Sequence, residues 1–300
     1  MAEEGKAKSG FAAIIGRPNV GKSTLLNQLV GQKVAIISDK PQTTRNQIRG
    51  ILTTERGQVV FIDTPGIHKP RNRLGEYMVE TARRALEEVD VILYVVDAAA
   101  EPGKGEQVIL QYLQEVSTPV VLVVNKIDLV KRGEWHEVAE FFKAQRDFAE
   151  VVPVSAVRGD NLEQLKEAIF SRLPEGPWFY APDMVTDQPE RLVIAELIRE
   201  KVLLLTREEI PYSVAVDIEE IAPRSPELLY VRAVIYTERD SQKGILIGRD
   251  GRMLKEVGKL AREELENLLG TRLYLDLWVK VKKDWRDNES YLRSLGYTYR

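Results

Sequence analysis

Cysteine is absent from the 300 residues, and histidine occurs only twice. Without thiols the chain can form no disulfide, no cysteine nucleophile and no zinc–sulfur site. Long apolar runs are absent too, because VILYVV and PVVLVV are far too short to span a bilayer. The N-terminal stretch MAEEGKAKSG has no apolar core of the kind a secretory signal needs. We therefore expect a cytoplasmic protein.

Strong positive charge is missing as well, since the net charge is −3. The chain as a whole does not have the charge of a nucleic-acid-binding protein, so any such site must be a local basic patch. Hydrophobic residues make up 44% and charged residues 30% of the sequence. These values are typical of a globular protein, and the length predicts about two domains.

The first domain is predicted from alternating strands and helices. Apolar strands are expected at 11–16, 58–63, 91–97, 119–126 and 151–156, and helices from Lys22, at 74–89 and at 161–173. This alternation indicates an α/β fold, with a mostly parallel sheet covered by helices on both faces. Ligands of such folds bind at the carboxyl ends of the strands. We expect a flexible N-terminus over residues 1–10 and the domain itself over residues 11–173.

The second half of the chain has a different order of predicted helices and strands. PEGPWFYAPDMVTDQP, at 174–189, contains four prolines and predicts a linker. Residues 190–300 are expected to form an α+β domain in the order α-β-β-α-α-β, with helices at 190–205 and 252–270 and strands at 213–221, 228–238 and 272–283.

GRPNVGKST, at 16–24, matches the G-x-x-x-x-G-K-[ST] pattern of a P-loop, between a predicted strand and a predicted helix. Its glycines let backbone N–H groups surround the phosphates, and the helix N-terminus adds its positive dipole. Lys22 would reach the β- and γ-phosphates, and Ser23 would bind Mg²⁺. The predicted nucleotide-binding residues here are Gly16, Arg17, Pro18, Asn19, Val20, Gly21, Lys22, Ser23 and Thr24.

Two further segments are predicted to contact the γ-phosphate and Mg²⁺. In DTPG, Asp63 follows a strand and suits the Mg²⁺ shell, while the Gly66 N–H can approach the γ-phosphate closely. In KPQTTRN, at 40–46, one threonine can give its hydroxyl to Mg²⁺, and Thr44 is favoured over Thr43. These contacts depend on the γ-phosphate, so the loop is a candidate switch. The nucleotide-binding set includes Asp63, Thr64, Pro65, Gly66 and Ile67.

NKID, at 125–128, indicates a guanine nucleotide. Asp128 can accept hydrogen bonds from guanine N1–H and the 2-amino group, which adenine lacks, and such a polar site strongly rejects the wrong base. Asn125 can bond the base and nearby backbone, and the stem of Lys126 can cover the ring. In SA, Ser155 precedes Ala156, whose N–H is expected to meet guanine O6.

In GRPNVGKS, QTTR, DTPG and NKID the sequence resembles GTPases of the TrmE–Era type. These proteins also carry an apolar residue after DTPG, where Ras-like GTPases carry the glutamine that orients water. The resemblance makes a K⁺ ion held by Asn19 a candidate substitute for an arginine finger, with Ile67 only shielding the site. His68 is the alternative general base. The predicted catalytic residues are Lys22, Thr44, Gly66 and Asn19, and the predicted metal ligands are Ser23, Thr44 and Asp63 for Mg²⁺ and Asn19 for K⁺.

GRDG, at 248–251, lies between two helical segments of the second domain. G-x-x-G alone is a weak signal, but here it fits the α-β-β-α-α-β order of a type II KH domain. That loop clamps the backbone of about four nucleotides of single-stranded nucleic acid. An ordinary α+β domain with a glycine turn remains the alternative. The predicted RNA-binding residues are Lys243, Ile247, Gly248, Arg249, Asp250, Gly251, Arg252 and Lys255, with Ile245 and Leu246 as groove or core residues.

A GTPase domain followed by a KH domain resembles the Era family of bacterial GTPases over roughly residues 10–295. The resemblance implies binding to 16S ribosomal RNA near its 3′ end, a role in maturation of the small ribosomal subunit, and loose association with the inner membrane. We expect a monomer that binds RNA and not DNA. Two alternatives stay open: an RNA-binding module with GTP as a structural ligand, and a membrane-associated signalling GTPase, which lacks a clear basic amphipathic helix here.

Overall fold

The computed structural model describes residues 7–298 of the chain. Its residues divide into two compact units. The first contains the described residues up to Arg71 and Gly75–Asp187, and the second contains Asn72–Leu74 and the described residues from Gln188 onward. Within residues 7–298 no helix combines the length and apolarity needed to cross a membrane.

The first unit is built on a six-stranded sheet in the order β2-β3-β1-β4-β5-β6. All neighbouring strands are parallel except β2 and β3. Strands β3 and β5 are buried along their whole length, as expected for strands covered on both faces. The strands are β1 (Lys8–Ile15), β2 (Ile48–Thr54), β3 (Gly57–Asp63), β4 (Val91–Asp97), β5 (Val120–Asn125) and β6 (Glu150–Pro153).

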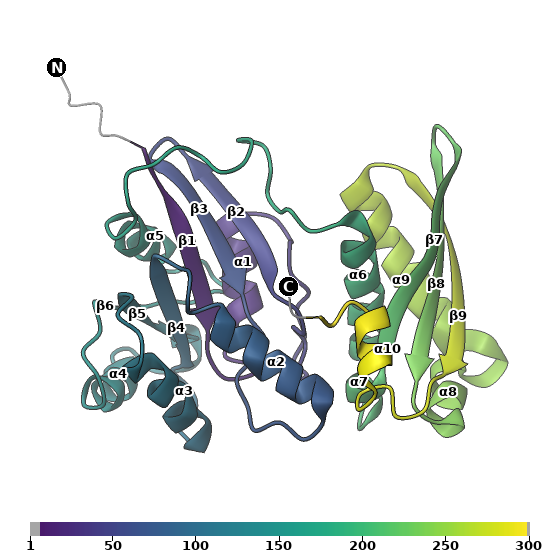
Figure 1. Cartoon of the computed structure of the whole chain (residues 1–300), viewed down its shortest axis with the longest axis horizontal. Coiled ribbons are helices and arrows are strands. Elements are labelled where there is room, and N and C mark those ends of the chain that lie inside the picture. Colours follow the sequence, from purple (N-terminus) through teal and green to yellow (C-terminus); the bar gives the residue numbers. More distant parts are fainter. Residues whose placement is uncertain (1–6, 299–300) are drawn as a thin grey trace. The chain divides into compact units, whose positions relative to one another are not determined.

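Helices cover both faces of this sheet, as the alternating pattern predicts (Figure 1). Successive β1 residues point to opposite faces, so Ala12 and Ile14 pack in one core cluster and Ala13 and Ile15 in the other. The first cluster is completed by α1 (Lys22–Val30) and α5 (Leu162–Phe170), the second by α2 (Arg73–Arg84), α3 (Lys104–Gln114) and α4 (Trp135–Lys143). A short 3₁₀ turn, η1 (Ile127–Leu129), follows β5.

The N-terminal prediction needs a correction. Strand β1 starts at Lys8, and Ser9 N–H donates to the Pro174 carbonyl at 3.0 Å, so residues 8–10 are part of the sheet and not a flexible tail. The rest of that predicted tail, residues 1–6, lies outside the described residues.

The proline-rich segment at 174–189 packs on the first unit over most of its length. Gln58 Oε1 accepts hydrogen bonds from the N–H groups of Phe179 and Tyr180 at 2.8 and 2.9 Å. The Phe179 ring lies 5.0 Å from that of Phe11, and Ile51 N–H donates to the Val185 carbonyl at 2.8 Å. Expected as a linker, this segment is a strap fixed along the edge of the sheet as far as Asp187.

The second unit has the predicted α-β-β-α-α-β order, with two short α-helices and one 3₁₀ turn added among the described residues. Its sheet runs β7-β8-β9, with β7 and β8 antiparallel and β8 and β9 parallel. Leu273 and Val279 of β9 are buried, as are the α9 residues Val257 and Ala261. The elements are α6 (Glu190–Leu205), α7 (Ile210–Ser213), β7 (Ala215–Ser225), β8 (Leu228–Thr237), α8 (Asp240–Ile247), η2 (Arg249–Gly251), α9 (Arg252–Leu269), β9 (Arg272–Val281) and α10 (Glu289–Ser294).

Candidate functional site

The P-loop joins β1 to α1, and its glycines are required by close contacts. Gly21, the N-cap of α1, has φ 97°, and a Cβ placed there would lie 2.4 Å from Asn125 Nδ2. A larger residue would therefore separate the phosphate loop from the base-binding motif. The open N-terminus of α1 then directs its free N–H groups into the loop, which suits an anion.

Lys22 is buried beneath this loop. Its Nζ donates to the carbonyls of Gly16 and Arg17 at 3.2 and 2.9 Å. Burial lowers the pKa of Lys22 to about 8, and the nearby Asp63 charge partly opposes that shift. A buried ammonium group held only by carbonyls still lacks a counterion of full charge, which phosphate oxygens would supply.

The three predicted Mg²⁺ ligands converge at one point. Ser23 Oγ donates to Asp63 Oδ2 at 2.7 Å and lies 3.0 Å from Thr44 Oγ1, which itself donates to Asp63 Oδ2 at 3.3 Å. The hydroxyl of Thr43 instead donates to the Lys40 carbonyl at 2.6 Å. The structure therefore brings Thr44, and not Thr43, to Ser23 and Asp63.

Asp63 is a buried carboxylate whose surroundings suit a bound cation. It is fully buried, and its Oδ1 accepts no hydrogen bond in the described part of the chain. Burial raises the pKa of Asp63 to about 6, with Lys22 and the two hydroxyls acting in the opposite direction. Residues 7–298 contain no cluster of three or more His, Asp or Glu side chains that could hold a metal. One carboxylate and two hydroxyls fit Mg²⁺ that is completed by phosphate and water oxygens.

The DTPG loop is held directly against the P-loop. Thr64 Oγ1 donates to the Ile14 carbonyl at 2.8 Å, and Ile67 N–H reaches the Gly16 carbonyl at 3.3 Å. A Cβ on Gly66 would lie 2.7 Å from the Pro18 nitrogen, so glycine is needed for this approach.

Ile67, which is expected to shield the site, is a core residue. Its side chain is 1% exposed and belongs to the core cluster that includes Ile15 and Ile62. Its apolar character is explained by packing.

His68 connects the two candidate switch loops. Its Nδ1 lies 2.9 Å from the Gly66 carbonyl and its Nε2 lies 3.0 Å from Gln42 Nε2. The Gly66 carbonyl and the Gln42 side-chain amide are therefore the partners of the two ring nitrogens. Both ring nitrogens are then engaged, which leaves His68 no free position as a general base in this conformation.

Asn19 is exposed in the P-loop and has φ 66°. Its Nδ2 donates to the Asp39 carbonyl at 2.7 Å, while its own backbone carbonyl accepts from Lys126 Nζ at 2.7 Å. Among the described residues its Oδ1 receives no hydrogen bond. A side-chain oxygen and a loop carbonyl therefore lie close together beside the P-loop.

The base-binding motif is tied to the P-loop by Asn125. Its Nδ2 donates to the Val20 carbonyl at 2.8 Å and its Oδ1 accepts from Ala156 N–H at 3.0 Å. The Ala156 N–H, expected to meet guanine O6, thus has Asn125 as its acceptor in this structure. Ser155 Oγ donates to Asp128 Oδ1 at 2.6 Å and orients the carboxylate predicted to read the base.

Sequence reasoning missed two ion pairs that support the site. Asp97 Oδ2 pairs with Lys126 Nζ at 2.6 Å. Arg17 Nε lies 2.5 Å from Oε2 of Glu106, which is 2% exposed in α3, and burial raises the pKa of Glu106. Asp97 could have been found, because it is a polar residue at the end of a predicted strand. Glu106 carries no sequence signal, since its burial depends on where α3 packs.

The GRDG loop connects α8 to α9 in the second unit. Gly248, Asp250 and Gly251 have φ values of 72°, 56° and 74°, which form a tight turn. Arg249, Arg252 and Lys255 are exposed around it, while Lys243 and Ile247 are partly buried. Ile245 is 53% exposed and Leu246 is fully buried, so only Ile245 and Ile247 of that run can line a groove.

Fold and site define the class of protein: a P-loop GTPase domain followed by a type II KH domain. The family model described as 50S ribosome-binding GTPase matches residues 11–126, and the KH domain model matches residues 209–286. GTPase Era of Heliobacterium modesticaldum is 60% identical over 97% of this chain and 98% of its own length. GTPase Era of Carboxydothermus hydrogenoformans is 58% identical with the same coverage.

Solved structures of Era proteins are also similar to this chain over nearly its whole length. A variant of Aquifex aeolicus Era bound to GDP and AlF4⁻ superposes with a TM-score of 0.94, at 44% identity, over 97% of this chain and all of that one. Era in complex with MgGDPNP and nucleotides 1506–1542 of 16S ribosomal RNA has a TM-score of 0.93, at 45% identity over 98% of this chain. The chain belongs to the GTPase Era family. It is a GTPase, which excludes the alternative of a non-catalytic module.

Proposed function

We propose that this chain is a GTP-driven switch that binds the 3′ region of 16S ribosomal RNA through its KH domain and assists maturation of the small ribosomal subunit. The observation that carries the GTP-switch part of the proposal is that Ser23, Thr44 and Asp63, from three separate segments, lie within hydrogen-bond distance of one another. Only a ligand that includes a cation and a γ-phosphate needs all three. Loss of that phosphate would release Thr44 and its loop.

In this proposal Ser23, Thr44 and Asp63 hold Mg²⁺, which neutralises phosphate charge when bound. Lys22 pairs with the β- and γ-phosphate oxygens in place of its present carbonyl partners. The Gly66 N–H, on a loop already in contact with the P-loop, donates to the γ-phosphate. Asp128, oriented by Ser155, selects guanine.

The proposal assigns K⁺ to the side of the P-loop where Asn19 lies. Support comes from Asn19 Oδ1, which receives no hydrogen bond within the described residues, and from the Asp39 carbonyl beside the same amide. Oxygens of this kind replace the water shell of a monovalent cation. The engagement of both His68 nitrogens supports a route that does not use this side chain as the base.

RNA binding is assigned to the GRDG loop. Exposed Arg249, Arg252 and Lys255 supply the local positive charge that the net charge of −3 conceals. The solved relative bound to 16S nucleotides supports this assignment. Cytoplasmic location, peripheral contact with the inner membrane and a monomeric state complete the proposal and are based on the family resemblance.

The test is GTP hydrolysis by the full chain with and without an RNA fragment from the 3′ end of 16S rRNA. We expect the fragment to bind and to change the hydrolysis rate. An RNA that binds no better than a scrambled fragment of equal length would contradict the rRNA assignment, while leaving the GTPase site intact.

A further inference from the structure

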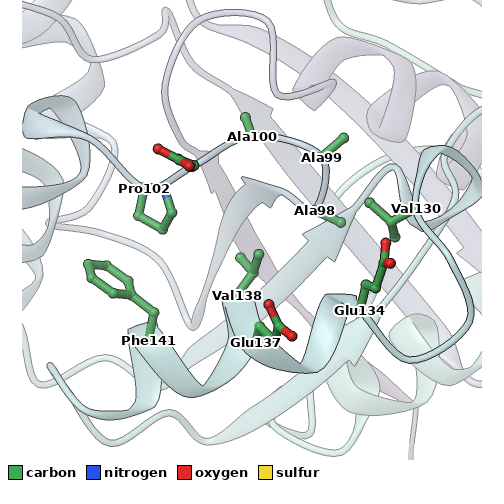
Figure 2. A pocket seen from close by; sticks show the side chains of 10 residues that line it. Ala98, Ala99, Ala100, Pro102, Val130, Glu134, Glu137, Val138 and Phe141 are labelled. Carbon is green, nitrogen blue, oxygen red and sulfur yellow. The ribbon is translucent and has the colours of Figure 1, made fainter.

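A groove on the first unit is lined by none of the residues assigned to GTP. It lies between the loop Ala98–Pro102, which follows β4, and helix α4, and its volume is about 370 Å³ (Figure 2). Nucleotide binding therefore leaves this hollow without an explanation.

The groove is apolar at its centre. Val138 and Phe141 extend from α4 toward the loop that carries Pro102 and the alanines (Figure 2). Phe141 is 41% exposed, whereas its neighbour Phe142 is 1% exposed in the core. An accessible aromatic side chain beside a hollow is suited to holding an apolar anchor from another molecule.

The rim of the groove is acidic, with Glu101 on the loop, Glu134 just before α4 and Glu137 on α4. Glu134 is engaged by Lys131, whose N–H donates to it at 2.9 Å. Glu101 and Glu137 have no ion-pair partner among residues 7–298. Carboxylates around an apolar centre repel RNA phosphates and attract a chain segment that carries lysine or arginine beside an apolar residue.

The loop that forms one wall is connected to the nucleotide site at both ends. Before it, Asp97 pairs with Lys126, and Ala98 N–H donates to the Asn125 carbonyl at 2.8 Å. After it, Glu106 pairs with Arg17 of the P-loop. The base-binding motif and the phosphate loop are therefore both bonded to the segment that forms this wall.

We propose that this groove docks a basic segment of a partner protein with one apolar anchor, and that docking changes the rate of guanine-nucleotide release. The occupant follows from the unpaired Glu101 and Glu137 around the apolar centre. The proposal holds whatever RNA the second unit binds.

The probe is a fluorescent twelve-residue peptide rich in lysine and arginine around a central leucine, compared with the same peptide carrying serine in place of leucine. Binding to the full chain is measured by anisotropy at low salt. The test variants are Glu101→Lys with Glu137→Lys, and Phe141→Ser. Glu140→Lys is the matched control, because Glu140 is exposed on α4, outside the groove, and pairs with Lys143.

We expect the wild type and Glu140→Lys to bind the leucine peptide, and both groove variants to bind it about tenfold more weakly. The leucine peptide should change the release rate of a fluorescent GDP analogue at least twofold in the wild type and in Glu140→Lys. It should leave that rate unchanged in both groove variants. Absence of peptide binding, equal binding by the double charge reversal and Glu140→Lys, or equal binding of the serine peptide would overturn the docking site. Binding with unchanged GDP release would overturn the coupling. Self-association that Phe141→Ser abolishes would assign the groove to a second copy instead.

Discussion

Ser23 Oγ donates a 2.7 Å hydrogen bond to Oδ2 of Asp63, which leaves Oδ1 of the same buried carboxylate without a partner in the described structure. The two residues come from two separate motifs, the P-loop and DTPG. Burial without a full counter-charge disfavours the ionised carboxylate and raises the pKa of Asp63, which is the environment that a bound cation would stabilise.

The first prediction concerns the stability of the nucleotide-free chain. Because the pKa of Asp63 is raised from 3.8 to about 6, its stabilising contribution is complete below about pH 4 and is lost as the pH rises through about 6. Asp63→Asn cannot ionise, so it should be more stable than the wild type by about 1–3 kcal/mol at pH 7. The two should be equal within error near pH 4. Hydrogen exchange of β1 and β3 amides reports opening of this unit.

The same substitution should weaken binding of Mg²⁺·GTP strongly, since the metal loses its carboxylate. Glu150→Gln is the control, because it removes a carboxylate that pairs with Arg172 at the start of β6, outside the nucleotide site. A stability gap that does not change between pH 4 and pH 7 would show that Asp63 is not the titrating group.

The second prediction concerns Ile67. Since the side chain is buried in the core, Ile67→Ala should destabilise the first unit by about 2–5 kcal/mol, and Ile67→Val by about 0.5–1.5 kcal/mol. Both variants should keep most of the single-turnover GTPase rate at temperatures where they are folded. Urea unfolding and rate measurements on the same samples separate the two effects. A Val variant with full stability but a large loss of rate would instead give Ile67 a role in the chemistry.

Ile67 also shows where sequence reasoning reached its limit. The motifs identified Ser23, Thr44 and Asp63 because the chemistry of Mg²⁺ and phosphate requires those residue types at strand ends. They could not show on which side of the loop Ile67 packs, since that depends on α2 and α3. Helices α3 and α4 and strand β2 were missed, although Ile109, Leu110 and Leu113 of α3 have helical spacing. The buried Glu106 interrupts the apolar face of α3, because it pairs with Arg17 in a distant segment.

The third prediction tests the base-reading residue. Asp128→Asn should move nucleotide preference from GTP toward xanthosine triphosphate, because the amide presents a donor where guanine has donors and xanthine has an acceptor. The Ser155 hydroxyl can still donate to the amide oxygen, so the loop should keep its shape. Competition binding with both nucleotides measures the change. An unaltered preference would show that Asp128 does not read the base.

The fourth prediction tests the GRDG loop with a matched pair of glycines. Gly251 and Gly270 flank α9 with φ values of 74° and 66°, and neither would meet a close contact with an added Cβ. Gly251→Asp and Gly270→Asp therefore impose similar backbone strain. Only Gly251→Asp places a carboxylate where RNA phosphates must approach.

We expect Gly251→Asp to weaken binding of the 16S 3′ fragment at least tenfold and to leave GTP affinity unchanged, while Gly270→Asp binds RNA like the wild type. Equal RNA affinity of the two folded variants would remove the loop from the RNA interface. Gly248→Asp is a less suitable probe, because a Cβ there would lie 2.8 Å from Met253 Cβ.

The last prediction concerns the cation beside the P-loop. Ile67 cannot orient water and both His68 nitrogens are engaged, whereas Asn19 Oδ1 and the Asp39 carbonyl offer oxygens on the exposed side of the loop. Hydrolysis should therefore be faster in K⁺ than in Na⁺, since the larger ion fits loop carbonyls and phosphate oxygens better. An ion in the place of an arginine finger would speed hydrolysis by a factor of up to roughly 10³–10⁵.

Asn19→Ala should lose the K⁺ response and keep GTP affinity within about tenfold, because one ligand among many is lost. Asn19→Asp keeps an oxygen at this position and should retain part of the response. Single-turnover hydrolysis in matched K⁺ and Na⁺ buffers decides the matter: equal wild-type rates would exclude the cation and direct the search to a group supplied by the RNA.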